Sequence, residues 1–200
     1  MSLLLDPLPK NLYINGKEYA IRWDHRTAIL YETMMLDEEV EGAEKPLLAL
    51  RLFYPIIPTD WAEALEGIQW FYRCGIVDDV SVKGKKKGKG KQDRIYSFEH
   101  DDSYIYSAFL EQYGLDLTEV QGLHWWRFRA LFQGLSEDSA LCKIMGYRGM
   151  DIPESMGKEQ KEFYRKMKEQ YRVPLAKGEQ EKMNAIEQAL LSGGDLTGLL

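Results

Sequence analysis

The segment 119–133 constrains the fold more than any other part of the chain, because its apolar residues point in nearly every direction around a helix. Its large apolar residues are Val120, Leu123, Trp125, Trp126, Phe128, Leu131 and Phe132. A helix with so wide an apolar surface must be covered by neighbours on several sides. We therefore expect a helix that is capped by Thr118 and lies at the centre of a helical protein.

Capping residues, apolar periodicity and proline or glycine stops predict further helices on both sides of this segment. The expected ranges are 25–36, 45–54, 61–74, 100–113, 137–147, 158–172 and, more weakly, 179–191. Gly75 and Gly114 occupy the positions where a left-handed residue ends a helix. Asn15-Gly16, between two apolar stretches, predicts a β-hairpin with a type I′ turn, because this pair accepts the two positive φ angles.

The expected fold class is mainly α: a multi-helix globular bundle with a small N-terminal β-hairpin and a flexible Lys/Gly loop. Residues 1–175 are predicted to form the helical domain with its N-terminal hairpin, and residues 176–200 a C-terminal helical or flexible tail. We expect residues 78–92 to form a mobile loop. No large apolar residue lies between Val82 and Ile95, so this stretch cannot bury enough surface to offset its ordering entropy.

Six of the lysines lie within nine residues, at Lys83, Lys85, Lys86, Lys87, Lys89 and Lys91, although the whole chain has a net charge of −6. An acidic protein with one short basic tract lacks the broad positive face that binding to phosphate backbones requires. No aromatic residues interleave with these lysines for base stacking. A solvated loop is therefore the favoured interpretation. A nucleic-acid-binding accessory protein that uses the Lys83–Lys91 tract stays open as an alternative.

The apolar runs, the N-terminus and the two cysteines indicate where the protein is located and whether its thiols are reduced. No apolar run approaches the roughly 18 residues that span a bilayer. The N-terminus has no basic region ahead of its leucines, as a secretory signal would. We therefore expect a soluble protein in the cytoplasm of the host cell, without a membrane contact, in which Cys74 and Cys142 are buried reduced thiols.

His124, beside Trp125, invites a catalytic interpretation. A lone histidine in an aromatic helix is more often a hydrogen-bonded core residue, because catalysis needs a partner held in a fixed geometry. His25 and His100 offer no better constellation. No nucleophile elbow, zinc-binding helix motif or phosphate-cradling glycine loop occurs, and no Cys or His pair has metal-ligand spacing. We predict that the protein is not an enzyme and uses no cofactor or metal.

One apolar seam suggests a contact surface on the helix predicted at 158–172. It consists of Met156, Phe163, Met167 and Tyr171. Packing against the protein's own domain is the commoner use of such a stripe. Methionine also suits an adaptable binding surface, because its side chain is unbranched and polarisable. The seam is therefore a candidate site for a partner protein, and both interpretations stay open.

Several blocks of the sequence, in a fixed order, resemble the gene-product-fifteen family of tailed bacteriophages and prophages. Near the N-terminus they are Asp6-Pro7-Leu8-Pro9 with the Asn15-Gly16 hairpin, then L-F-Y-P-I-I-P at 52–58 and W-F-Y-R-C-G at 70–75. The most specific block runs from Tyr96 to Leu135 and includes L-H-W-W-R-F-R-A-L-F. Ile144-Met145-Gly146-Tyr147-Arg148 and Phe163-Tyr164-Arg165 follow. The resemblance covers about residues 5–175.

The resemblance implies a phage or prophage tail morphogenesis protein that looks like a tail-assembly chaperone. Chaperones of that class bind the tape-measure protein before the tail tube polymerises around it. The expected partner is therefore the tape-measure protein or another tail protein, with the chain acting as a homo-oligomer or in several copies. An alternative that stays open is a structural tail or connector component retained in the virion.

Overall fold

The structure is a computed structural model that describes residues 2–76 and 94–174. The predicted fold class is confirmed: these residues form seven helices and one two-stranded antiparallel sheet. The elements are β1 (Asn11–Ile14), β2 (Lys17–Ala20), α1 (His25–Leu36), α2 (Lys45–Phe53), α3 (Trp61–Tyr72), α4 (Asp102–Tyr113), α5 (Trp125–Gln133), α6 (Ala140–Gly149) and α7 (Lys158–Gln170). The predicted loop at 78–92, the weak helix at 179–191 and the tail at 176–200 lie outside the described residues. None of the described helices has the length and apolar character that a bilayer crossing requires.

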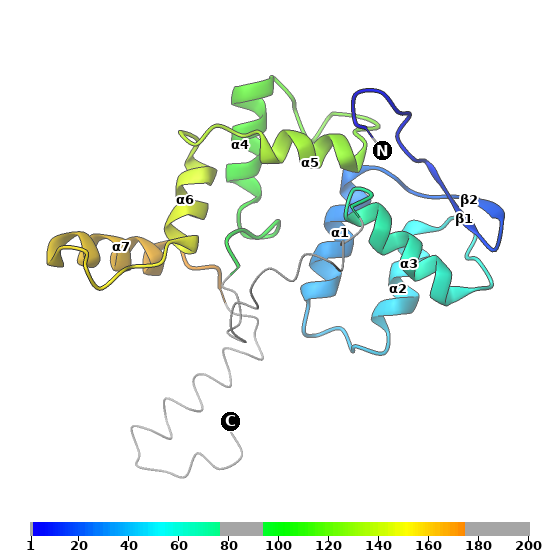
Figure 1. Ribbon diagram of the computed structural model, residues 1–200, viewed down its shortest axis with the longest axis horizontal. Helices are drawn as coiled ribbons and strands as arrows, with labels where there is room; N and C mark the ends of the chain where they lie inside the picture. Colours follow the sequence, from blue (N-terminus) through cyan, green and yellow to red (C-terminus); the bar gives the residue numbers. More distant parts are fainter. Residues whose placement is uncertain (1, 77–93, 175–200) are drawn as a thin grey trace, which may run out of the picture.

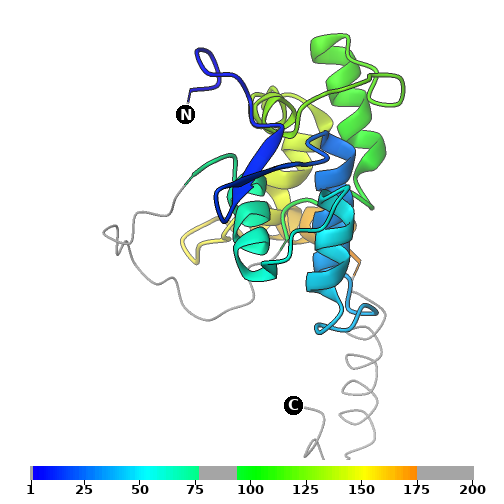
Figure 2. The ribbon, with the colours of Figure 1, turned by 90° about the vertical axis from the view of Figure 1, so that its right-hand side faces the viewer.

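The predicted hairpin is present and lies against α3 (Figure 2). Asn15 and Gly16 have φ angles of 50° and 72°, as a type I′ turn demands. Leu12 and Ile14 alternate with exposed residues along β1 and are buried. A hairpin is marginal by itself in water, so this apolar contact with α3 holds it in place.

Short polar side chains cap α1 and α3, which begin at the predicted residues His25 and Trp61. Asp24 accepts a hydrogen bond from the backbone N–H of Thr27, and Asp60 accepts one from that of Glu63. α2 ends at Phe53, two residues before Pro55, as expected from the proline stop. These caps satisfy backbone groups that a helix end leaves without a partner.

α5 lies beside α4, between it and the N-terminal part of the molecule (Figure 1), and buries Trp125, Trp126, Phe128 and Phe132 in the core. The indole N–H groups of Trp125 and Trp126 donate to the carbonyl oxygens of Tyr72 and Phe71 at the end of α3, at 2.8 and 2.7 Å. On another side of α5, Phe128 stacks on Phe109 of α4 with ring centroids 5.0 Å apart. α5 therefore joins the α1–α3 side of the core to the α4 side.

The prediction that this helix starts at Glu119 is wrong, because α5 begins only at Trp125 with His124 as its N-cap. Thr118 does not cap the helix: its N–H and hydroxyl both donate to the Asp116 carboxylate. Gly122 then adopts a φ of +63°. The backbone of His124 forms an isolated antiparallel β-bridge with that of Asp24, so the segment before α5 lies along the start of α1.

The starts of α4 and α6 also differ from their predicted positions by two or three residues. α6 begins at Ala140, after the predicted start at 137, because Ser139 caps it by accepting from the Cys142 N–H. Ser136 instead forms a preceding turn. α4 begins at Asp102, although the side chain of its N-cap Asp101 makes no cap hydrogen bond. That carboxylate has another partner, described below.

α3 ends in a tight left-handed turn against the Trp126 ring. Cys74 holds the left-handed position with a φ of 57°, so the assignment of that position to Gly75 is corrected by one residue. Gly75 follows with a φ of +73°, and its N–H donates to the Trp70 carbonyl. A Cβ at Gly75 would lie 2.9 Å from a Trp126 ring carbon.

Replacing Gly75 by alanine is therefore expected to lower the free energy of unfolding by about 2–3 kcal/mol, through backbone strain and a forced shift of Trp126. Gly114→Ala is the matched control. Its φ is +60°, but an added Cβ there meets no atom within 4 Å. The control should lose only the backbone contribution of about 1 kcal/mol. Urea denaturation of both variants measures the difference, and equal losses would contradict the assigned role of the ring.

Candidate protein-binding site: the α6–α7 arm

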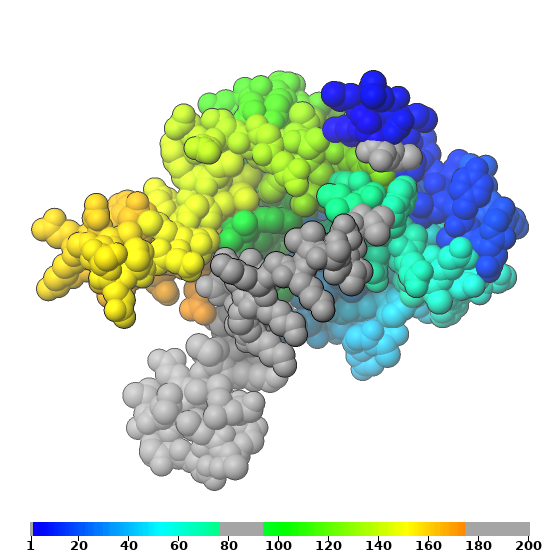
Figure 3. Space-filling model, viewed as in Figure 1, coloured from blue at the N-terminus to red at the C-terminus, as the bar shows by residue number. Residues whose placement is uncertain are grey.

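Residues 140–171, comprising α6, the connection 150–157, α7 and Tyr171, form an arm on the body of the protein. Here the body means the described residues before Ala140. α6 packs on α4, and α7 packs on α6. The arm projects from one end of the molecule, where it is coloured yellow to orange in Figures 1 and 3. The seam predicted as a partner-binding site lies on this arm.

α7 is an amphipathic helix without a single buried residue. Its half-buried residues are Lys161, Tyr164, Met167 and Lys168, with Tyr171 following at the C-cap. Both lysines hold the helix against the connection 150–157. Lys161 Nζ donates to the Glu154 carbonyl at 2.6 Å, and Lys168 Nζ donates to the Met150 carbonyl at 2.9 Å. The stems of both side chains lie along the helix while the charged ends are hydrogen-bonded.

The structure places the four predicted seam residues at different depths. Met156, Met167 and Tyr171 are half-buried, whereas Phe163 is 49% exposed. Phe163 and Tyr171 both contact the ring of Tyr147 on α6, at centroid distances of 6.3 and 6.0 Å. The seam therefore serves partly to hold α7 on α6, and it presents Phe163 to solvent.

Tyr147 is the central contact between the two helices of the arm. Its ring stacks on Tyr171 and also meets Phe163 and Tyr164 of α7. An aromatic pair contributes about 0.5–1.5 kcal/mol beyond its buried area. These contacts compensate for the lack of fully buried residues on α7.

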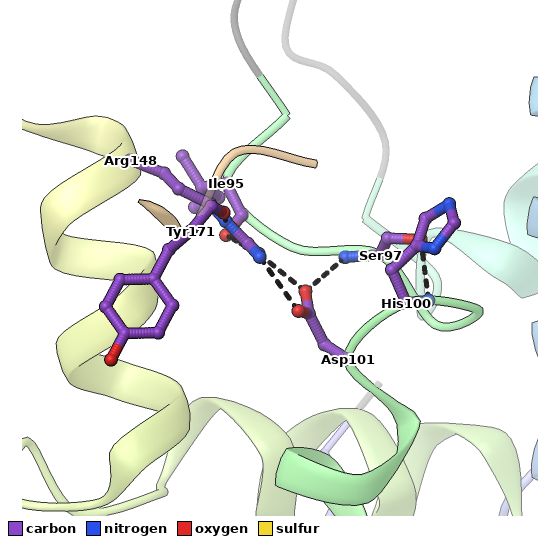
Figure 4. A network of polar contacts seen from close by, with 6 residues as sticks. All are labelled: Ile95, Ser97, His100, Asp101, Arg148 and Tyr171. Atoms are coloured by element: carbon purple, nitrogen blue, oxygen red, sulfur yellow. Dashed lines mark hydrogen bonds and ion pairs between the residues drawn. The ribbon is translucent and has the colours of Figure 1, made fainter. Parts of the chain in front are cut away.

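A buried ion pair fixes the arm to the body (Figure 4). Arg148, the last basic residue of α6, donates to both carboxylate oxygens of Asp101 at the start of α4, at 2.6 and 2.9 Å. The Arg148 and Asp101 side chains are only 7% and 1% exposed. Bidentate arginine–carboxylate pairs combine strength with a defined geometry, so α6 is held in one orientation on α4.

The same guanidinium reaches two further segments. It donates to the carbonyl oxygen of Ile95 at 3.2 Å and, through Nε, to that of Tyr171 at the end of α7. Asp101 additionally accepts from the backbone N–H of Ser97 at 2.8 Å. Arg148 thus joins α4, α6, the segment at 95–97 and the end of α7, as Figure 4 shows.

Sequence reasoning did not find Tyr147, Arg148 and Asp101 as residues of this site. One signal was available: Arg148 falls on the same helical face as Leu141 and Ile144, both of which are buried. A charged residue on an apolar face indicates a buried partner. Nothing in the local pattern identifies that partner, because Asp101 lies 47 positions away in the chain.

Charge is distributed unevenly between the arm and the body. The arm, residues 140–171, carries seven Lys or Arg and five Asp or Glu, a net charge of +2. Residues 2–76 and 94–139 carry ten Lys or Arg and twenty Asp or Glu, a net charge of −10. The field around the body therefore repels an acidic partner, and the arm attracts it.

The two histidines of the core have structural roles. His124 Nδ1 accepts from the Trp126 N–H at 3.1 Å and caps α5, while Nε2 donates to the Pro9 carbonyl at 2.9 Å. His25 Nδ1 donates to the Leu123 carbonyl at 3.3 Å. Burial lowers the pKa of both imidazoles below their ordinary value of 6.5.

The cysteines are free, and each is half-buried rather than fully buried as predicted. Burial raises the pKa of the Cys74 thiol, which disfavours the reactive thiolate. Within residues 2–76 and 94–174, no three His, Cys, Asp or Glu side chains gather as they would around a metal ion. The Lys83–Lys91 tract lies outside the part of the chain that the structure describes.

Comparison with known proteins identifies the family to which the chain belongs. The model of the bacteriophage Gp15 protein family matches residues 4–173. The chain is therefore a phage-related protein, and it belongs to the bacteriophage Gp15 protein family. No curated protein and no solved structure shows significant similarity to it. The predicted resemblance is confirmed, and the matched range includes both the body and the arm.

Breaking the ion pair tests whether Arg148 holds the arm. Arg148→Met leaves the Asp101 carboxylate buried without its partner, so we expect a loss of about 3–5 kcal/mol in the free energy of unfolding. The double variant Asp101→Leu/Arg148→Met should lose less than Arg148→Met alone, because no charge is left uncompensated. Urea denaturation measures both. A double variant at least as unstable as Arg148→Met would contradict this role for the pair.

The buried histidines predict a pH-dependent stability. Their folded-state pKa values lie below 6.5, so the unfolded chain binds more protons as the pH falls below that value. Stability is complete above about pH 6.5 and decreases below it, by up to about 1.4 kcal/mol per pH unit for each histidine. His124→Asn keeps a capping side chain but cannot titrate. Between about pH 7.5 and 5.5, the range in which histidine ordinarily titrates, the unfolding free energy of this variant should fall less steeply than that of the wild type. An equal slope for the two proteins would refute the contribution of His124.

Proposed function

We propose that this phage protein is a tail-assembly chaperone that binds the tape-measure protein through the α6–α7 arm. Membership of the bacteriophage Gp15 protein family supports the phage context. The proposal places the action in the host cytoplasm, and it requires no catalytic step. In keeping with that, both ring nitrogens of His124 and Nδ1 of His25 are engaged with the backbone.

The observation that carries the proposal is the incomplete cover of α7. None of its residues is buried, and Phe163 exposes about half of its side chain beside Tyr147 and Tyr164. Most helices in globular proteins gain their stability by burying an apolar face. Among the described residues, α6 packs against this apolar face, and a second helix could cover the exposed edge at Phe163.

The physical task of such a chaperone fits a surface of this kind. A tape measure is a long helical chain with apolar stripes, and a bare stripe of that length would aggregate. A helix-on-helix contact covers the stripe while polar residues remain in water. Met156 and Met167 belong to the same predicted seam as Phe163, and methionine side chains adapt to partners of different shape.

Co-expression of the full-length chain with the tape-measure protein of the same phage tests the proposal. We expect the chain to keep the tape measure soluble and to co-purify with it. Phe163→Ala should weaken this association on the order of 30-fold in Kd, because exposed aromatic anchors commonly contribute about 2 kcal/mol to an interface. Pull-down yield and titration calorimetry give the measurement.

Trp61→Ala is the matched control, since Trp61 on α3 is also 49% exposed but belongs to the body. It should bind as the wild type does. Equal binding by wild type and Phe163→Ala would remove the arm from the interface, and failure of the wild type to co-purify would reject the chaperone role. Stoichiometric protein in purified virions, measured by mass spectrometry, would favour a retained structural component instead.

A further inference from the structure

A shallow groove runs along the arm between α6 and α7. Its volume is about 530 Å³ and it is open to solvent on one side. The lining residues are Lys143, Gly146, Tyr147, Gly149, Met150 and Tyr164. The groove adjoins the exposed edge at Phe163, because Tyr147 and Tyr164 of its lining contact that ring. None of the four residues of the predicted seam is among the lining residues.

The chemistry of the lining suits an apolar side chain. Two phenol rings and one thioether provide adaptable apolar walls. Gly146 forms part of the floor, and a Cβ built there meets no atom within 4 Å. Replacing a helical alanine by glycine costs stability, so a glycine at this position in α6 is unfavourable for the helix while it keeps the groove open.

Lys143 is the only charged residue of the lining. Its side chain is 52% exposed, and its ion pair with Asp138 spans 3.9 Å to a carboxylate that is 99% exposed. An exposed pair of this geometry contributes little, so Lys143 is able to exchange Asp138 for a carboxylate of a ligand. At the other end of α6, the carbonyl oxygen of the C-cap Met150 already accepts a hydrogen bond from Lys168.

Charge complementarity identifies the kind of helix that fits. The arm carries +2 beside a body that carries −10, so within the described residues an acidic helix is attracted to the arm and repelled by the body. A second copy of this chain brings a body of the same negative charge, and the two bodies repel each other.

We propose that the groove binds one bulky apolar side chain from an acidic amphipathic helix of the partner, with Lys143 pairing to a carboxylate on that helix. This inference rests on the proposed function and specifies the partner's chemistry. The binding mode is a helix in a groove, in which one anchor residue contributes most of the affinity and the charges set orientation.

Fluorescence anisotropy with labelled peptides tests the groove on the full-length protein. The probe is an amphipathic peptide of about 20 residues, long enough to form a helix, with glutamates on its polar face and one phenylalanine. Two comparison peptides replace the phenylalanine by alanine or the glutamates by lysines. We expect the acidic phenylalanine peptide to bind at least about tenfold more tightly than either.

Gly146→Leu should abolish binding of this peptide, because the leucine side chain occupies the groove without a clash. The helix itself should be at least as stable, since leucine is a better helix former than glycine. Gly42→Leu is the matched control: a Cβ at Gly42 also meets no atom within 4 Å, and the site lies in the body. Lys143→Glu should weaken binding about tenfold and reduce its salt dependence, whereas Arg127→Glu on α5 should not.

Three results would overturn the inference: no binding of the acidic phenylalanine peptide, equal binding by wild type and Gly146→Leu, or equal binding of the lysine peptide. A concentration-dependent dimer that Gly146→Leu abolishes in sedimentation experiments would also overturn it, since a second copy would then occupy the groove. Failure of tape-measure co-purification with intact peptide binding would reject only the chaperone role. Co-purification with the tape-measure protein without peptide binding would reject only the groove.

Discussion

One guanidinium connects the two parts of this protein. Arg148 pairs with both oxygens of Asp101 and also donates to the carbonyl oxygens of Ile95 and Tyr171. A buried ion pair gains little net stability, because desolvation of the charges offsets their attraction. Its value lies in geometry, since any other orientation of α6 would leave a buried charge without its partners. The position of α7, and with it the exposure of Phe163 and the shape of the groove, follows from this pair.

The body and the arm are stabilised in different ways. In the body, the aromatic side chains of α5 fill the core, and the indole N–H groups of Trp125 and Trp126 bind the end of α3. In the arm, α7 has no buried residue and relies on Tyr147, two lysine contacts and Arg148. A part with so few buried contacts opens more readily than the core. Surfaces that bind partners are commonly drawn from such parts, which agrees with the proposed role of the arm.

The sequence predicted correctly those turns and helix starts that depend on residues close together in the chain. The turn at Asn15-Gly16 and the caps at Asp24 and Asp60 depend on residues within a few positions of each other, and the hairpin and the helix starts at His25 and Trp61 agree with the predicted ones. The start of α5 was misplaced by six residues, because backbone pairing between His124 and Asp24 replaced the helix that the apolar pattern indicated. Before α6, Ser136 and Ser139 are both good capping residues; Ser139 caps the helix, whereas the backbone N–H of Ser136 donates to Gln112 on α4. The Asp101–Arg148 pair joins distant positions, so periodicity could not predict it.

The central claim is that the chain works by contact through its arm, and hydrogen–deuterium exchange of the full-length protein with and without bound tape-measure protein tests it most directly. The account predicts that binding slows exchange in α6 and α7, at residues 140–171, and leaves the amides of α1–α3 unchanged. Slower exchange confined to the body, with the amides of α7 exchanging as fast in the complex as in the free protein, would contradict it.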